Sequence, residues 1–147
     1  MSDSDLLKLY SSRILALAAE MPKTDRLDAP MATVKKRAPL CGSTVTVDLS
    51  IKDGIITAYG QDVKACALGQ AAASVVGSAI VGCSTDQVIS ARDGLKAMLK
   101  ANAAPPQAPF DGLEVLIPAR EFKNRHDSIM LSLNASVEAI KEIQTQT

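Results

Sequence analysis

The sequence predicts an α+β fold in which a small three-stranded antiparallel sheet packs against several helices. Alternating polar and apolar residues over 44–51, followed by Asp53-Gly54, are typical of a β-hairpin. The run 66–80 consists almost entirely of Ala, Val, Gly and Ser, which predicts a central helix that other backbones approach closely. Ser84 with Gln87 three residues later forms a capping box at the start of another helix. The expected element order is α-β-β-β-α-α-α, without internal repeats.

The first helix is expected close to the N-terminus, where Asp3 can act as its cap and Pro22 ends it. Apolar side chains recur between them at roughly helical spacing: Leu6, Tyr10, Ile14, Leu17 and Met21. We expect one domain over residues 1–147, with this helix and an irregular lead-in over 1–30. A proline-rich internal linker is expected over 103–112, because proline cannot continue the preceding helix.

The three strands are expected at Thr33–Arg37, at residues 44–51 and at residues 55–59. In the second strand the apolar residues have period two, so one face is buried and the other is solvated. Extending this parity backwards places Cys41 on the side of Val45 and Val47, unless Gly42 breaks the alternation.

The remaining helices follow the central one. The helix that begins after Ser84 carries apolar residues on one face (Val88, Ala91, Leu95 and Met98 or Leu99), and the last helix carries Ile129, Leu133, Val137 or Ser136, and Ile140. Between them lie the proline-rich linker, a brief apolar run over 113–117, and a polar loop after Pro118.

Composition excludes several classes of function. The net charge is zero, with 16 basic and 16 acidic residues, and Trp is absent, so a nucleic-acid partner is not expected. The apolar run 66–83 is short and interrupted by polar residues, so no membrane association is expected. The acidic start, Met1–Asp5, is unlike a basic leader, which favours a reducing cytoplasm. One histidine, no Gly-x-Ser-x-Gly elbow, no phosphate-binding glycine loop and no Cys-x-x-Cys pair argue against common catalytic sites.

Two of the three cysteines lie where a reactive thiol would be placed. Cys66 precedes the central helix, whose N-terminus stabilises a thiolate, and Cys41 precedes the hairpin. The pair is therefore a candidate metal or sulfur site. Alternatively, both are small buried hydrophobes, or they pair with each other under oxidation. Cys83 is interpreted as structural.

The motifs Cys41-Gly42 and Cys66-Ala67-Leu68-Gly69-Gln70, separated by a hairpin, resemble the iron–sulfur cluster assembly scaffold family of NifU/IscU type. The resemblance covers roughly residues 33–143 and is nearer to the sulfur-mobilisation, SufU-like branch. It implies a NifU N-terminal-domain-like fold and a site of three cysteines and one aspartate. Cys41 and Cys66 match two of these cysteines, and Ser43 stands where the aspartate is expected.

The family's third cysteine aligns with the segment His126-Asp127-Ser128-Ile129. Asp127 takes its place, or Ser128 if the alignment shifts by one residue. The resemblance thus implies a metal site of Cys41 and Cys66 completed by Asp127 or His126, which would hold iron, a [2Fe–2S] cluster or zinc. Asp127 can instead cap the last helix, and His126 can be a capping or surface residue.

The resemblance implies a scaffold-like function rather than an enzyme. Its partners would be a cysteine desulfurase and cluster-recipient proteins. Two alternatives remain open because Ser43 and Asp127 depart from the family pattern: a diverged paralogue that serves as an interaction or regulatory module without a cluster, and a zinc-dependent sulfur-transfer accessory.

Overall fold

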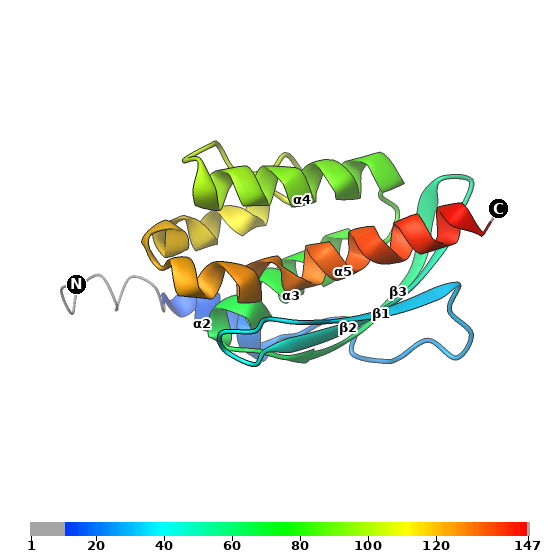
Figure 1. Ribbon diagram of the computed structural model, residues 1–147, viewed down its shortest axis with the longest axis horizontal. Coiled ribbons are helices and arrows are strands. Elements are labelled where there is room, and N and C mark those ends of the chain that lie inside the picture. The colour runs from blue at the N-terminus through cyan, green and yellow to red at the C-terminus, as the bar shows by residue number, and fades with distance from the viewer. Residues whose placement is uncertain (1–10, 147) are drawn as a thin grey trace.

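The structure, a computed structural model, describes residues 11–146 and confirms the predicted α+β fold (Figure 1). Its first described helix, α2 (Ser12–Ala19), is capped by Ser11 and ends at Ala19, three residues before Pro22. The predicted cap Asp3 and the positions Leu6 and Tyr10 lie outside the described residues.

The sheet consists of β1 (Ala32–Arg37), β2 (Thr44–Lys52) and β3 (Ile55–Lys64), in the order β1-β2-β3, with both pairs antiparallel. The alternation in β2 has its expected consequence, since Val45, Val47 and Leu49 are fully buried. Asp53 and Gly54 both have positive φ, 52° and 76°, which is the conformation a two-residue hairpin turn of this hand requires.

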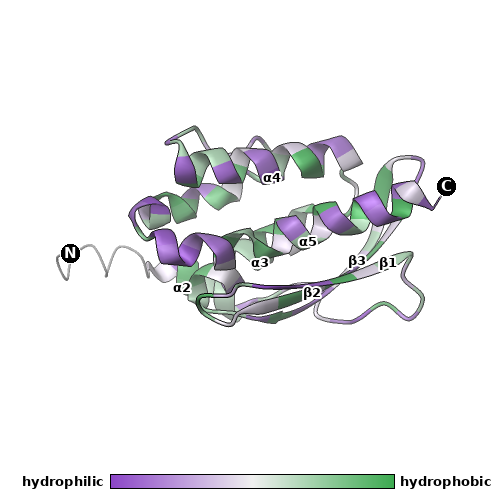
Figure 2. Cartoon of the chain, in the orientation of Figure 1, coloured by the Kyte–Doolittle hydropathy of each residue, from purple (hydrophilic) through white to green (hydrophobic). Residues whose placement is uncertain are grey.

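The long helices form layers above the sheet: α3 (Ala67–Ala79), α4 (Thr85–Lys100) and α5 (His126–Thr145). α5 packs on β1 and β2 and also contacts α3 and α4, so α4 and the sheet lie on opposite sides of it (Figure 1). α3 is buried along most of its length, and the capping box of Ser84 and Gln87 is present at the start of α4. Buried apolar residues of the sheet and of α3 belong to one hydrophobic core, and Figure 2 shows the hydrophobic colouring of both elements.

The segment between α4 and α5 differs from the prediction. It forms two 3₁₀ helices, η1 (Asp111–Glu121) and η2 (Lys123–Arg125), where a short apolar run and a polar loop were expected. Pro118 lies inside η1. Arg120, near its end, donates from Nε to the Met98 carbonyl at 2.7 Å and from a terminal nitrogen to the Ala103 carbonyl at 2.6 Å. Arg120 thus binds the C-terminal end of α4 and fixes the chain that leads into α5.

A buried carboxylate attaches the irregular lead-in to the sheet. The side chain of Asp48 is fully buried and accepts hydrogen bonds from the Arg26 guanidinium, the Leu27 amide and the Thr33 hydroxyl. Burial raises the pKa of Asp48, but these donors outweigh it and hold that pKa below its ordinary value. No helix within residues 11–146 is both long and apolar enough to cross a bilayer.

Candidate functional site

Four polar side chains from three separate segments meet in one hydrogen-bonded row. Cys41 and Ser43 come from the loop between β1 and β2, Cys66 is the N-cap residue of α3, and Ser128 lies in the first turn of α5. The Cys41 Sγ lies 3.0 Å from the Ser43 Oγ, the Ser128 hydroxyl donates to the Ser43 Oγ at 3.1 Å, and the Cys66 Sγ lies 3.4 Å from the Ser128 Oγ. We call this group the thiol–hydroxyl site.

A tight turn presents the first two of these residues. The Ala38 amide donates to the Ser43 carbonyl at 2.8 Å, and the Gly42 amide donates to the Ala38 carbonyl at 2.9 Å. Gly42 has φ +71°, so the chain reverses there and β2 begins only at Thr44. Cys41 is consequently exposed and does not share the buried side of Val45 and Val47, because the positive φ of Gly42 breaks the alternation, which is the exception that the sequence-based prediction allowed.

A glycine allows α5 to approach α3 at the site. A Cβ atom built on Gly69 would lie 2.5 Å from the Ser128 Oγ and 3.1 Å from the Ser128 carbonyl oxygen. Real Cβ atoms do not occupy such positions without displacing their neighbours. Because Gly69 has no side chain, Ser128 of α5 comes within reach of Cys66, which lies about one turn before Gly69 at the start of α3.

The surroundings favour the thiolate form of Cys41. The Ser43 hydroxyl has the largest effect and lowers the pKa of Cys41; partial burial opposes it, and the Ser43 amide, the Ser128 hydroxyl and the Arg125 charge lower that pKa further. A thiolate is the form of cysteine that attacks electrophiles and binds metals. Cys83 behaves differently: it is buried, its Sγ lies 3.1 Å from the Ala79 carbonyl oxygen, and burial raises its pKa.

The structure does not bring His126 and Asp127 into the thiol–hydroxyl site. His126 is 1% exposed; its Nε2 lies 2.9 Å from the Ala119 carbonyl oxygen, and its buried Nδ1 has no hydrogen-bond partner among the described residues. Asp127 is exposed in the first turn of α5 and lines a hollow next to α4. Within residues 11–146, no group of three or more His, Cys, Asp and Glu side chains is placed to hold a metal ion.

The geometry of an α-helix explains why Ser128, and not Asp127, lies in the thiol–hydroxyl site. Adjacent residues differ by about 100° around the axis, so only one of Asp127 and Ser128 can face the two cysteines. Ser128 faces them and is 1% exposed. Ser128, the position that aligns after a one-residue shift, is therefore the one that reaches Cys66. Ser43, which stands where the family has an aspartate, lies between Cys41 and Ser128.

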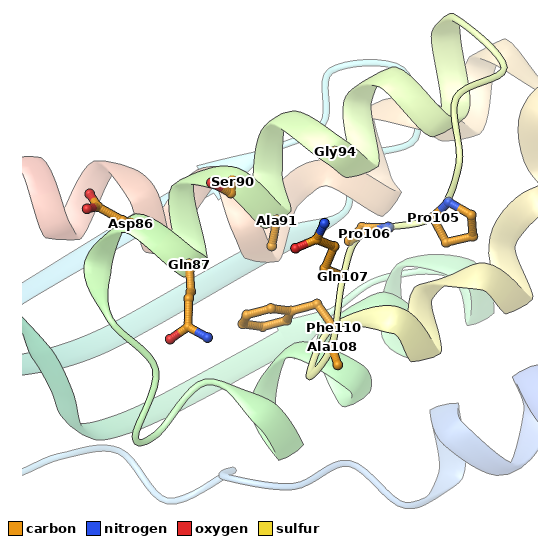
Figure 3. Close-up of a pocket in the computed structure, with 10 residues that line it drawn as sticks. All are labelled: Asp86, Gln87, Ser90, Ala91, Gly94, Pro105, Pro106, Gln107, Ala108 and Phe110. Carbon is orange, nitrogen blue, oxygen red and sulfur yellow. The ribbon is translucent and has the colours of Figure 1, made fainter.

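A separate pocket of about 480 Å³ lies between α4 and the proline-rich segment (Figure 3). Its lining includes Gln87, Pro106, Gln107 and the buried ring of Phe110. The Gln87 side chain already accepts a hydrogen bond from the Ser84 amide in the capping box. None of the predicted site residues lines this pocket. Its polar lining residues are Asp86, Gln87, Ser90 and Gln107, and neither a cysteine nor the histidine lines it.

The chain is similar to solved structures over most of its length. It is similar to the N-terminal part of a nitrogen-fixing NifU-like protein from Brucella abortus, with 37% identity, coverage of 97% of this chain and 99% of that one, and a TM-score of 0.95. A proposed iron–sulfur cluster assembly scaffold protein for the SUF system from Fervidobacterium islandicum AW-1 shares 15% identity over 90% of this chain and 96% of that one, with a TM-score of 0.80.

A third structure, of a protein described only as hypothetical, shares 22% identity over 88% of this chain and 95% of that one, with a TM-score of 0.80. At these identities the second and third similarities concern the fold alone. No protein-family model matches the chain, and no curated protein matches it.

Proposed function

Because this chain belongs to the NifU-like family, as its resemblance to NifU/IscU-type scaffolds predicts, we propose that it is an iron–sulfur cluster assembly scaffold-like protein. Iron, a nascent [2Fe–2S] cluster or zinc would be its cargo, held by the thiolates of Cys41 and Cys66. The observation that carries the proposal is the row of contacts at 3.0, 3.1 and 3.4 Å that joins these two thiols through Ser43 and Ser128.

The distances between neighbouring atoms in the row are close to those between ligands of one ion. Around a tetrahedral metal with metal–sulfur bonds of about 2.3 Å and metal–oxygen bonds of about 2.0 Å, neighbouring ligand atoms are about 3.3–3.8 Å apart. The three contacts of 3.0–3.4 Å are slightly shorter, so small outward rotations of the side chains would admit an ion. Thiolates suit iron and zinc, whereas the neutral hydroxyls of Ser43 and Ser128 are poor donors. Two thiolates with two hydroxyls would therefore hold the cargo less firmly than three thiolates with a carboxylate.

The same site supports sulfur transfer from a cysteine desulfurase. The Cys41 thiolate is exposed and hydrogen-bonded by Ser43, so it can attack the outer sulfur of a persulfide on the desulfurase. The new S–S bond forms on Cys41 while the desulfurase cysteine leaves as a thiolate. Cluster-recipient proteins would then receive the assembled product. In this proposal the chain turns over no substrate of its own and works in a reducing cytoplasm, where its thiols stay reduced.

The second candidate function is an interaction or regulatory module that keeps the fold and binds no cluster. The position of Asp127 and His126 outside the thiol–hydroxyl site favours this second function, since Cys41 and Cys66 are the only cysteines that contribute to the site and no histidine or carboxylate among the described residues joins them.

Anaerobic reconstitution with iron and sulfide, and separately with zinc, distinguishes the two functions. The wild-type protein is expected to retain metal and to develop cluster-type absorbance with iron and sulfide. Cys41→Ala and Cys66→Ala should each retain less metal than the wild type, because only one thiolate remains, whereas Cys83→Ala, at the buried thiol, should retain as much as the wild type. A wild-type protein without metal or cluster absorbance would refute the scaffold function. For sulfur transfer, persulfide labelling by a desulfurase should disappear in Cys41→Ala.

A further inference from the structure

A charged groove runs between α4 and α5 on the face of α5 turned away from the thiols. Arg92, Lys96 and Lys100 recur every four residues on α4, so they lie on one helix face over about 12 Å. They line a hollow of about 410 Å³. A second hollow of about 240 Å³ shares Arg92 and Asn134 with the first and adds residues of β1 and α5, so the two are continuous. We call this continuous surface the α4–α5 groove; Figures 1 and 2 show the two helices side by side, with hydrophilic residues on both.

The α4–α5 groove is more basic than the chain as a whole. Five basic and three acidic side chains line it, whereas the sequence has 16 of each. Two of the cations already have partners: Arg92 with Asp93 at 2.7 Å, and Lys36 with Glu138 at 2.6 Å.

The other three cations, Lys96, Lys100 and Lys141, are exposed and form no ion pair within residues 11–146. They lie on both helices, so positive charge flanks the groove along its length.

The floor of the groove differs from its rim. Met130 and Val137 of α5 line it and are 5% and 1% exposed, with the half-buried Asn134 between them. The floor therefore exposes little besides Asn134, and ammonium groups stand on both walls, an arrangement complementary to a narrow chain that carries carboxylates. We propose that the α4–α5 groove binds an acidic segment of a partner protein.

The position of the groove lets such a segment bind without covering the thiols. Ser128 faces Cys66, whereas its neighbours Asp127 and Met130 face α4. The bound segment would therefore lie next to the thiol–hydroxyl site, on the other side of the first turns of α5. This inference does not rest on the proposed cargo, because neither Cys41 nor Cys66 contributes to the groove.

Fluorescence anisotropy with a labelled twelve-residue peptide of alternating Glu and Ala tests the proposal at low and at physiological salt. Binding should weaken as salt increases, and Lys96→Glu combined with Lys100→Glu should weaken it about tenfold. The matched control is Lys35→Glu combined with Lys52→Glu, which places the same charge change on exposed strand residues outside the groove. Asp127→Asn removes a negative charge from the groove and should tighten binding about threefold, an increase that misfolding does not produce.

Three results would overturn the proposal. The first is equal loss of affinity in the groove variant and the control variant, which would indicate a general charge effect. The second is tight binding of polyphosphate or of a single-stranded twelve-nucleotide RNA under conditions where the peptide does not bind. The third is absence of peptide binding to the wild-type protein at low salt. Thermal unfolding of each variant establishes that the fold is retained.

Discussion

Replacement of Gly69 by alanine tests the close approach on which the thiol–hydroxyl site depends. The new methyl group would lie 2.5 Å from the Ser128 Oγ, 2.9 Å from the Ala65 Cβ and 3.1 Å from the Ser128 carbonyl oxygen. Rotation of the Ser128 hydroxyl relieves only the first contact. The carbonyl belongs to the backbone of α5, so the start of that helix must move away from α3 by several tenths of an ångström.

Two opposing effects set the magnitude. Overpacking of a well-filled interior costs about 1–3 kcal/mol. Alanine is a better helix former than glycine by about 1 kcal/mol. The free energy of unfolding should therefore fall by about 1 kcal/mol, which corresponds to a decrease in Tm of about 3 °C for a chain of this length.

Gly94→Ala is the matched control, because Gly94 also lies within a helix, α4, but a Cβ there would meet Pro106 at an ordinary 3.6 Å. This variant should gain about 1 kcal/mol and raise the Tm by about 3 °C. Thermal unfolding followed by circular dichroism measures both. In addition, Gly69→Ala should bind less iron on reconstitution, whereas Gly94→Ala should bind as much as the wild type. Equal stabilisation by the two substitutions would refute the close packing of Ser128 on α3.

Three further predictions concern Asp48 and the cysteines. The depressed pKa of Asp48 means that its ionised form contributes stability above about pH 4 that is lost as the pH falls below that value. Asp48→Asn should therefore lower the free energy of unfolding at pH 7 by about 2 kcal/mol and flatten the decline of that free energy in acid. Urea unfolding at a series of pH values measures both effects, and an unchanged decline in acid would contradict the role of Asp48. Ser43→Ala removes the donor with the largest effect on the pKa of Cys41, so iodoacetamide should alkylate Cys41 more slowly at neutral pH. The control Ser90→Ala, at the separate pocket next to the proline-rich segment, should leave the rate unchanged. Cys83 is buried with a raised pKa and should react with a thiol reagent only after unfolding, so rapid labelling of all three cysteines in the native protein would argue against its burial.

Much of the fold could be predicted because its signals are local. The alternation of residues 44–51 and the Asp53-Gly54 turn determine the hairpin, and the capping box determines the start of α4. The 3₁₀ helix η1 was not predicted, because Pro118 normally ends an α-helix. A signal was nevertheless present: Leu113, Leu116 and Ala119, all fully buried, recur every three residues, which is the period of a 3₁₀ helix.

The candidate site could be predicted only in part. The residue types and positions of Cys41 and Cys66 suffice to propose a pair of reactive thiols. The choice between Asp127 and Ser128 required the rotational phase of α5. That phase is visible in the buried serines Ser128, Ser132 and Ser136, which recur every four residues.

The role of Gly69 depends on how close α3 and α5 lie, and no pattern within either helix contains that distance.

Cobalt(II) titration under anaerobic conditions is the most direct test of the central claim that Cys41 and Cys66 bind one metal together. Thiolate-to-cobalt charge-transfer absorption reports the number of bound thiolates. The account predicts that the wild type binds one equivalent of cobalt through two thiolates. Cys41→Ala and Cys66→Ala should each show about half of the wild-type charge-transfer absorption per bound cobalt, and the double variant should show none. Undiminished charge-transfer absorption in either single variant, or none in the wild type, would contradict a shared site.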